Sequence, residues 1–348
     1  MIQADQLSEV TSSASPQEIS DKFDENGYIV VRGLFDPAED LQPTVDEYAD
    51  VLDREAKAWH AAGDLSSDYA GLPFEERIIK VMAETGDRIY DYFRIFLNPP
   101  NATKADTPLH YGPAMFGLLT NNKLLDVIAA IIGPEITLNP VNVVRVKPPE
   151  RYLPASSDYH VGLTQAWWHQ DQSVFSEDIK DIDVITAWLP LTDADKEMGC
   201  LKVVPGSHRG DDLSLHCLNP DPHRVGIPEM MLGQGRHYVE TKLGDVHFHH
   251  RRLQHGSLPN LSDRFRFSFD LRYQPTDQAS GESSGMPDGV MVPGLIARSP
   301  SDPGRETRDW REWAEYQEAM RQQFMAIDWE DWPTVNQNQF VSDHGYCI

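Results

Sequence analysis

The chain has 348 residues and a formal net charge of −25 at pH 7, and 40% of its residues are hydrophobic. That length can bury a large core, whereas the acidic balance argues against nucleic acid and anionic membrane surfaces as partners, because both favour a basic protein surface. No run approaches the roughly 18 uninterrupted apolar residues of a membrane span, and the first residues do not have the pattern of a secretion signal, so we expect a cytoplasmic protein whose three cysteines are reduced thiols.

Helical patterns dominate the first third of the chain, after a polar stretch over 1–14 that we expect to be a loose tail. Ser15-Pro16-Gln17-Glu18 has the spacing of a capping box, with proline at the first helical position, and predicts the start of a helix. Helices are predicted at four places, over about 16–25, 36–61, 74–97 and 122–132, with a strand at 28–31. We therefore expect residues 15–135 to be mainly helical support for a sheet.

Strand patterns take over from Ile136. Segments rich in β-branched and aromatic residues between turn signals lie at 136–146, 183–191, 200–204, 237–242, 246–250 and 264–273. In the last of them, apolar residues at odd positions alternate with polar residues at even positions, which predicts one apolar and one polar face. Many strands joined by turns predict a mostly β fold with flanking helices, a cupin-like double-stranded β-helix or jelly roll. We expect its core at 136–275, followed by a loop and a C-terminal helix within 276–348.

The segment Trp167-Trp168-His169-Gln170-Asp171 carries the candidate chemistry. If it is a strand, His169 and Asp171 project from the same face, because side chains alternate with period 2. One more histidine would complete a facial triad, the arrangement that holds non-haem Fe(II) and leaves neighbouring coordination positions open. The candidate for that histidine is His255. By itself the pair favours a plainer interpretation, two solvated strand residues.

Five motifs in order resemble the phytanoyl-CoA dioxygenase family of Fe(II)/2-oxoglutarate oxygenases. They are His169-Gln170-Asp171, Ala187-Trp188, the segment from Gly199 to His208, Gly244-Asp245-Val246, and His255-Gly256-Ser257 followed by Asn260 and Arg266. The resemblance runs from about residue 16 to residue 275 and implies one oxygenase domain over 1–348. Many members have asparagine where this chain has Met198, which affects a local turn contact only.

The resemblance implies that His169, Asp171 and His255 bind Fe(II), with 2-oxoglutarate and O₂ as co-substrates. It also implies that Arg266 binds the far carboxylate of 2-oxoglutarate, since a guanidinium can hold a carboxylate with two parallel hydrogen bonds. Arg264, on the same strand face, is the rival for this role.

Two further residues are candidates for the 2-oxoglutarate pocket. Ser257 is expected to donate a hydrogen bond to the same carboxylate, and Trp188 is expected to form a wall, although a turn hydroxyl and a core indole explain the two residues equally well. The group His247, His249 and His250 looks like a metal cluster in isolation. Because the family pattern has a strand here, we interpret these histidines as strand residues, with His249 as a candidate for pocket lining.

The carboxylate of Asp171 separates this chain from related halogenases, in which a small residue replaces it. The resemblance therefore implies oxidative decarboxylation of 2-oxoglutarate to succinate and CO₂, coupled to hydroxylation or a related oxidation of an unactivated C–H bond. The acidic charge favours a small polar or zwitterionic metabolite over a CoA thioester as the substrate. Two other hypotheses stay open, a cupin-type oxygenase that does not use 2-oxoglutarate and a non-catalytic ligand-binding β protein.

Overall fold

The structure is a computed structural model that describes residues 7–97, 102–154, 163–174, 182–210, 213–214, 216–218, 225–278 and 294–328. Its large sheet has eight strands, in the order β1 (Glu9–Thr11), β2 (Tyr28–Arg32), β10 (Val246–His250), β5 (Ile185–Pro190), β12 (Arg266–Pro275), β3 (Ile136–Leu138) and β13 (Leu295–Arg298), with β4 (Val143–Lys147) paired to β12. The small sheet has the order β11 (His255–Ser257), β6 (Leu201–Val203) and β9 (His237–Val239), and a separate pair consists of β7 (Cys217–Leu218) and β8 (Val225–Gly226).

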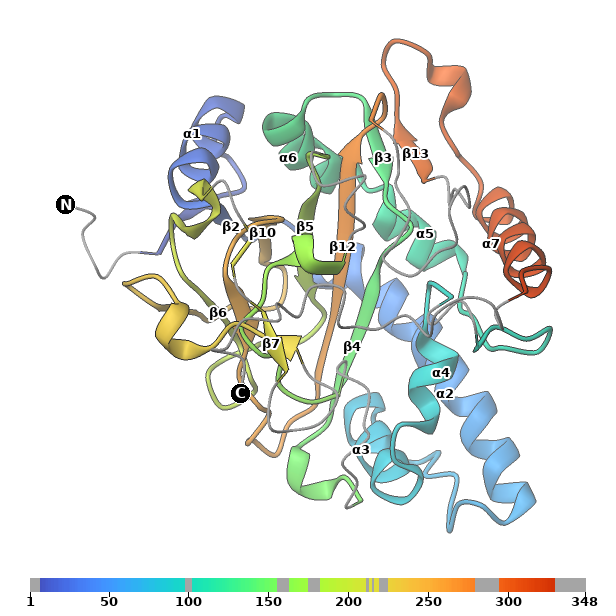
Figure 1. The fold of residues 1–348 in the computed structure, drawn as a ribbon. Helices are drawn as coiled ribbons and strands as arrows, with labels where there is room; N and C mark the ends of the chain where they lie inside the picture. The colour runs from blue at the N-terminus through green and yellow to red at the C-terminus, as the bar shows by residue number, and fades with distance from the viewer. Residues whose placement is uncertain are drawn as a thin grey trace.

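The large and small sheets share a buried interior. Side chains from both sheets meet in one apolar cluster, which contains Tyr28, Val30, Trp188, Leu201, Val203 and Val239. Figure 1 shows β2, β10, β5 and β12 of the large sheet side by side at the centre of the molecule, with helices around them. This arrangement of a large and a small sheet around one interior is the double-stranded β-helix, or jelly roll, and the predicted fold class is confirmed.

The large sheet has one apolar face and one polar face, because successive side chains of a strand point to opposite sides. On the apolar face Phe267, Phe269 and Leu271 of β12 belong to the main hydrophobic core, together with residues of the helices. The other face carries buried polar side chains, which are Lys147, Thr186, His247, His249, Arg266, Ser268, Asp270 and Arg272, together with the partly buried Arg145. Burying so many polar and charged groups is unfavourable unless each finds a partner, so this face is where a ligand or metal site is expected.

The helices follow the sequence patterns, except for the one at Pro113–Leu119, which was not predicted. They are α1 (Pro16–Asn26), α2 (Gln42–Ala62), α3 (Phe74–Thr85), α4 (Arg88–Phe93), α5 (Pro113–Leu119), α6 (Asn122–Ile132) and α7 (Trp310–Met325). The predicted cap of α1 is present, since the Ser15 hydroxyl accepts a hydrogen bond from the Glu18 backbone N–H at 3.2 Å. The single pattern over 74–97 corresponds to two helices, α3 and α4, because the chain turns at Gly86, whose φ is 65°.

Several short strands were not predicted from the sequence, among them β1 and β13. β1 lies in the predicted loose tail and pairs in parallel with β2, and β13 lies in the predicted C-terminal loop and pairs antiparallel with β3. With three and four residues, these strands are too short for a period of 2 to be recognised. Cys200 is a free buried thiol, but Cys217 is disulfide-bonded, so the prediction of three reduced thiols is wrong for Cys217.

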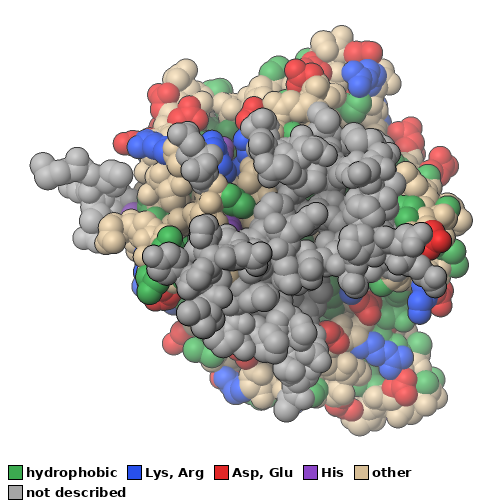
Figure 2. All heavy atoms as spheres, viewed as in Figure 1, with side chains coloured by type: hydrophobic (Ala, Val, Ile, Leu, Met, Phe, Trp, Pro, Cys, Tyr) green, Lys and Arg blue, Asp and Glu red, His purple; other side chains and the backbone are tan. Residues whose placement is uncertain are grey.

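One helical stretch, Pro113–Ile132, is long and apolar enough by composition to cross a membrane, but a core helix passes the same test. Here the stretch is two helices, α5 and α6, and Leu124, Leu125 and Ile128 of α6 belong to the main hydrophobic core. On the face drawn in Figure 2, acidic and basic side chains are interspersed over the coloured surface, and the coloured atoms form no continuous basic area. This surface agrees with the net charge of −25.

Candidate active site

The backbone brings His169 and His255 side by side. The two residues form an isolated antiparallel bridge, in which each backbone N–H donates to the other residue's carbonyl at 2.8 and 2.9 Å. Gly256 permits this close approach, since a Cβ at that position would lie 2.7 Å from the Ala166 carbonyl oxygen. Asp171 does not continue a strand but begins a 3₁₀ turn, Asp171–Val174. The prediction that period 2 of a strand aligns His169 with Asp171 is therefore wrong, because a bridge and a turn place them instead.

Three side chains nevertheless converge as the sequence predicts. One ligand atom each from His169, Asp171 and His255 lies within 4.8 Å of the other two, and in the part of the chain that the structure describes this is the one group of His, Cys, Asp or Glu that meets the geometry of a metal site. The Asp171 Oδ1 atom lies 3.6 Å from His169 Nε2 and 3.7 Å from His255 Nε2. Two imidazoles and one carboxylate in this arrangement fit non-haem Fe(II).

Hydrogen bonds select the tautomer of both histidines. The Nδ1 atom of His169 lies 2.7 Å from the Trp167 carbonyl oxygen, and the Nδ1 atom of His255 lies 2.9 Å from the Leu253 carbonyl oxygen. A carbonyl can only accept, so each Nδ1 carries the proton and each Nε2 keeps a free lone pair. Burial, with the neighbouring His169 and His249, holds the pKa of His255 well below its usual value, so the imidazole is neutral as a metal ligand must be.

Asp171 is fixed by two polar neighbours on the large sheet. Arg272 donates from Nη2 to Oδ1 at 3.0 Å and from Nε to Oδ2 at 3.2 Å, and the Thr186 hydroxyl donates to Oδ2 at 2.5 Å. Burial alone would raise the pKa of this carboxyl group, but Arg272 and the nearby histidines hold it well below its usual value. The carboxylate is therefore charged and held in one orientation.

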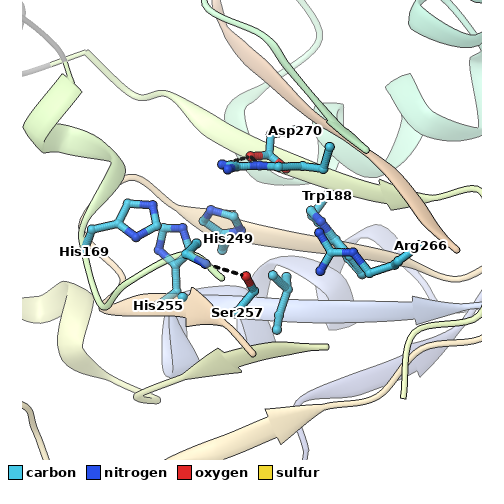
Figure 3. A pocket seen from close by; sticks show the side chains of 11 residues that line it. His169, Trp188, His249, His255, Ser257, Arg266 and Asp270 are labelled. Atoms are coloured by element: carbon cyan, nitrogen blue, oxygen red, sulfur yellow. Dashed lines mark hydrogen bonds and ion pairs between the residues drawn. The ribbon is translucent and has the colours of Figure 1, made fainter. Parts of the chain in front are cut away.

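A cavity extends from the two histidines to Arg266 on β12 (Figure 3), and Trp188 and Ser257 lie along it. Arg266 is 1% exposed, and its guanidinium donates to the Gly199 carbonyl oxygen at 2.5 Å and lies 5.5 Å from the centre of the Trp188 ring. Burial and the nearby Arg145 lower the pKa of Arg266 to about 9. Such a buried guanidinium calls for an anion.

Lys147 adds a second buried basic side chain beside Arg266, to which it is paired across β4 and β12. Its Nζ atom donates to the Ser257 hydroxyl at 2.6 Å, and Ser257 Oγ also accepts from the Ala166 N–H at 2.9 Å. Ser257 thus accepts two hydrogen bonds and keeps its own proton to donate. Burial, with Arg266 and Arg145 nearby, holds the pKa of Lys147 well below its usual value. Among the described residues neither Lys147 nor Arg266 has an ion-pair partner, whereas Arg145 is paired with Asp270 at 2.6 Å.

The structure separates the two arginines that the sequence leaves as rivals. Arg264 precedes β12, has a side chain that is 46% exposed, and forms an ion pair with Asp195. Arg266 is the first residue of β12 and faces the cavity. His249 lines the cavity, as expected for a pocket residue, while His247 lies beyond it.

Sequence reasoning missed four residues of this site, which are Arg145, Lys147, Thr186 and Arg272. The even-numbered positions of β12 were a usable signal for Arg272, because they share a face with Arg266. The other three carried no signal, since their place depends on the pairing of β4 and β5 with β12.

Comparisons with known proteins agree with this geometry. The profile of the phytanoyl-CoA dioxygenase (PhyH) family matches residues 23–268. The peroxisomal phytanoyl-CoA dioxygenase of Homo sapiens is 24% identical over 267 residues, which are 73% of this chain and 67% of that protein. The 1-deoxypentalenic acid 11-beta-hydroxylase of Streptomyces arenae is 25% identical over 276 residues, which are 76% of this chain and 83% of that protein.

A solved structure of the epimerase SnoN in complex with Fe3+, alpha ketoglutarate and nogalamycin RO is also similar, with a TM-score of 0.48 and 19% identity over 83% of this chain and 96% of that chain. The family match decides between the hypotheses that the sequence leaves open. It excludes a cupin-type oxygenase that does not use 2-oxoglutarate and a non-catalytic β protein. The chain belongs to the phytanoyl-CoA dioxygenase family, and it is an iron- and 2-oxoglutarate-dependent dioxygenase.

Proposed function

We propose that this enzyme hydroxylates an unactivated C–H bond of a small-molecule metabolite. The overall reaction consumes the substrate, O₂ and 2-oxoglutarate and yields the hydroxylated product, succinate and CO₂. The observation that carries the proposal is a cavity lined by His169 and His255 of the triad at one end and by Arg266 at the other, a buried cation that has no ion-pair partner among the described residues. A molecule with a chelating oxo-acid end and a distant carboxylate matches both ends.

We propose that His169, Asp171 and His255 hold Fe(II) through Nε2, a carboxylate oxygen and Nε2. Iron with bound 2-oxoglutarate supplies the oxidising power for C–H cleavage when O₂ is present. The protein's part is to keep the His255 imidazole neutral, to keep Asp171 charged, and to exclude water from a site whose side chains are largely buried.

The far carboxylate of 2-oxoglutarate is assigned to Arg266, with Ser257 as a second donor and Trp188 as a wall. Lys147 orients the Ser257 hydroxyl by donating to its oxygen at 2.6 Å. The co-substrate carboxylate supplies the anion that the buried basic side chains lack. Its binding therefore also relieves the repulsion between these side chains. Asp171 supports hydroxylation over halogenation, since its carboxylate would hold the iron where related halogenases have a small residue and bind a halide.

A conservative change of Thr186 tests the support of Asp171. Thr186→Val keeps the β-branched shape but removes the hydroxyl that donates to Asp171 Oδ2 at 2.5 Å. We expect Fe(II) affinity to fall about 10-fold, because loss of a partner to a metal ligand typically costs 10–100-fold. The measurement is competition for Fe(II) with a chelator. Thr137→Val is the matched control, since its hydroxyl donates to Thr276 elsewhere in the same sheet. Equal affinities in the two variants would show that Thr186 has no part in the site.

The substrate class is proposed from charge and from relatives. The relatives named above act, by their names, on phytanoyl-CoA and on 1-deoxypentalenic acid, which are small organic molecules. The net charge of −25 disfavours a polyphosphate-bearing thioester and favours a small polar or zwitterionic metabolite.

The test is a substrate screen with Fe(II), 2-oxoglutarate and ¹⁸O₂, in which succinate and product masses are recorded. A true substrate is expected to raise succinate formation above the uncoupled rate, and to give a product that carries one ¹⁸O atom. Coupled succinate formation with a product that gains no oxygen would contradict hydroxylation while leaving the dioxygenase class intact.

A further inference from the structure

We infer that His249 is a further binding residue of this site, one that hydrogen-bonds the oxo-acid end of 2-oxoglutarate. The inference rests on the proposed function of the cavity. His249 lies on β10, is 2% exposed, and lines the cavity together with His169, His255 and Arg266. Figure 3 shows its ring beside those of His169 and His255. The ring centres of His249 and His255 are 4.2 Å apart.

The ring nitrogens of His249 are buried without a hydrogen-bond partner in the described part of the chain. Its Nε2 atom lies 3.4 Å from Asp171 Oδ2, but that oxygen already accepts from Thr186 and from Arg272. Both lone pairs of Oδ2 are thereby occupied. Buried polar groups in folded proteins are almost always paired. Because His249 also lines the cavity, an acceptor bound there would satisfy its ring.

The acceptor is identified by the neighbours of His249. The His249 ring lies beside the triad at one end of the cavity. The donor groups at the other end are Arg266 and Ser257, and Lys147 donates to the Ser257 hydroxyl. If a molecule spans the cavity from the triad to Arg266, the end of it that binds iron is the end that lies next to His249. In 2-oxoglutarate this end is a carboxylate and a keto group, whose oxygens accept hydrogen bonds from an imidazole N–H.

A different role, that of a fourth protein ligand to iron, is less well supported by the coordinates. The group of atoms that lie within 4.8 Å of one another contains His169, Asp171 and His255, and His249 is not in it. The two roles make different predictions, because loss of a ligand weakens iron binding, whereas loss of a hydrogen bond to 2-oxoglutarate weakens only the co-substrate.

The same strand offers a matched control. His247 points to the same side of β10, is 0% exposed, and has two ring nitrogens without a hydrogen-bond partner among the described residues. Its ring stacks on Tyr28 at 5.3 Å and does not line the cavity. His247→Phe therefore removes the same chemical groups from the same sheet face, outside the proposed binding site.

The experiment compares wild type, His249→Phe and His247→Phe without O₂. Fe(II) affinity is measured by competition with a chelator, and the iron-loaded proteins are then titrated with 2-oxoglutarate, by calorimetry and by the visible charge-transfer band of the iron complex. We expect His249→Phe to weaken 2-oxoglutarate binding about 10-fold or more, the usual effect of losing a hydrogen bond to a charged group, and to shift the band. Iron affinity of this variant, and both properties of His247→Phe, should match wild type. His249→Gln, which keeps an N–H donor, should recover most of the lost affinity.

The inference is overturned if His249→Phe binds 2-oxoglutarate as tightly as wild type and its charge-transfer band is unshifted. It is also overturned if weaker iron binding accounts for all of the lost 2-oxoglutarate affinity. If His249→Phe does not fold, His249→Leu is compared with His249→Gln on the same readouts, and equal affinities would again overturn it. Failure of the wild-type protein itself to bind 2-oxoglutarate in the presence of Fe(II) would instead contradict the proposed function, and the inference with it.

Discussion

Replacing His255 by alanine is expected to abolish iron binding and turnover together. The imidazole supplies one of only three ligand atoms that converge in the described residues, so its loss should exceed the roughly 10–100-fold penalty of removing a mere supporting partner. Bound Fe(II) per chain and 2-oxoglutarate-dependent succinate formation are the measurements, and both should fall to background.

The control for this variant is His208→Ala. It removes another buried histidine, whose contacts do not include the triad. His208 lies against Gly27 and its Nε2 atom is 3.1 Å from the Asp24 carbonyl oxygen. This variant should keep wild-type iron content and turnover. A His255→Ala protein that is folded and still binds one iron with undiminished turnover would be incompatible with the proposed ligand set.

Replacing Arg266 by alanine is expected to raise the dissociation constant of 2-oxoglutarate about 30-fold or more, because truncating one member of a buried charged pair costs about 2–5 kcal/mol. Iron affinity should change little, since Arg266 contacts Gly199, Ser268 and Trp188 and none of the triad. Anaerobic titration of the iron-loaded protein measures the effect. Arg264→Ala is the control, since that side chain is exposed and paired with Asp195.

A second consequence concerns stability. In the absence of 2-oxoglutarate, Arg266 is a buried cation with no ion-pair partner among the described residues, and burial lowers its pKa to about 9. We therefore expect Arg266→Met to unfold at the same or a higher denaturant concentration than wild type without the co-substrate, because an apolar side chain replaces a desolvated charge. A clear loss of stability in Arg266→Met would mean that the guanidinium is mainly a structural hydrogen-bond donor.

The sequence predicted the chemistry of the site better than its local structure. The strong alternation of β12 placed Arg266 on the polar face, and the motifs around His169 and His255 named the convergent residues. The route of convergence was wrong, because period 2 was assumed where the chain forms a bridge and a 3₁₀ turn. Such a bridge depends on a partner far away in the sequence, and no local pattern reports it.

Residues that act through other residues were the hardest to predict. Lys147 becomes a neighbour of Arg266 only through the register of β4 and β12, and Thr186 reaches Asp171 only because β5 lies between β10 and β12. Arg264 and Arg266 are equivalent by alternation, and only the start of β12 and the ion pair with Asp195 separate them. His249 belongs to the same class, as its significance lies in unpaired nitrogens that only the three-dimensional structure reveals.

The most direct test of the central claim is a crystal structure of the protein grown without O₂ in the presence of Fe(II) and 2-oxoglutarate, with anomalous scattering recorded at the iron edge. We predict a single iron peak bonded to His169 Nε2, Asp171 and His255 Nε2, and a 2-oxoglutarate molecule whose far carboxylate meets the guanidinium of Arg266. An iron peak at any other group of side chains, or a co-substrate carboxylate that lies away from Arg266, would contradict the account.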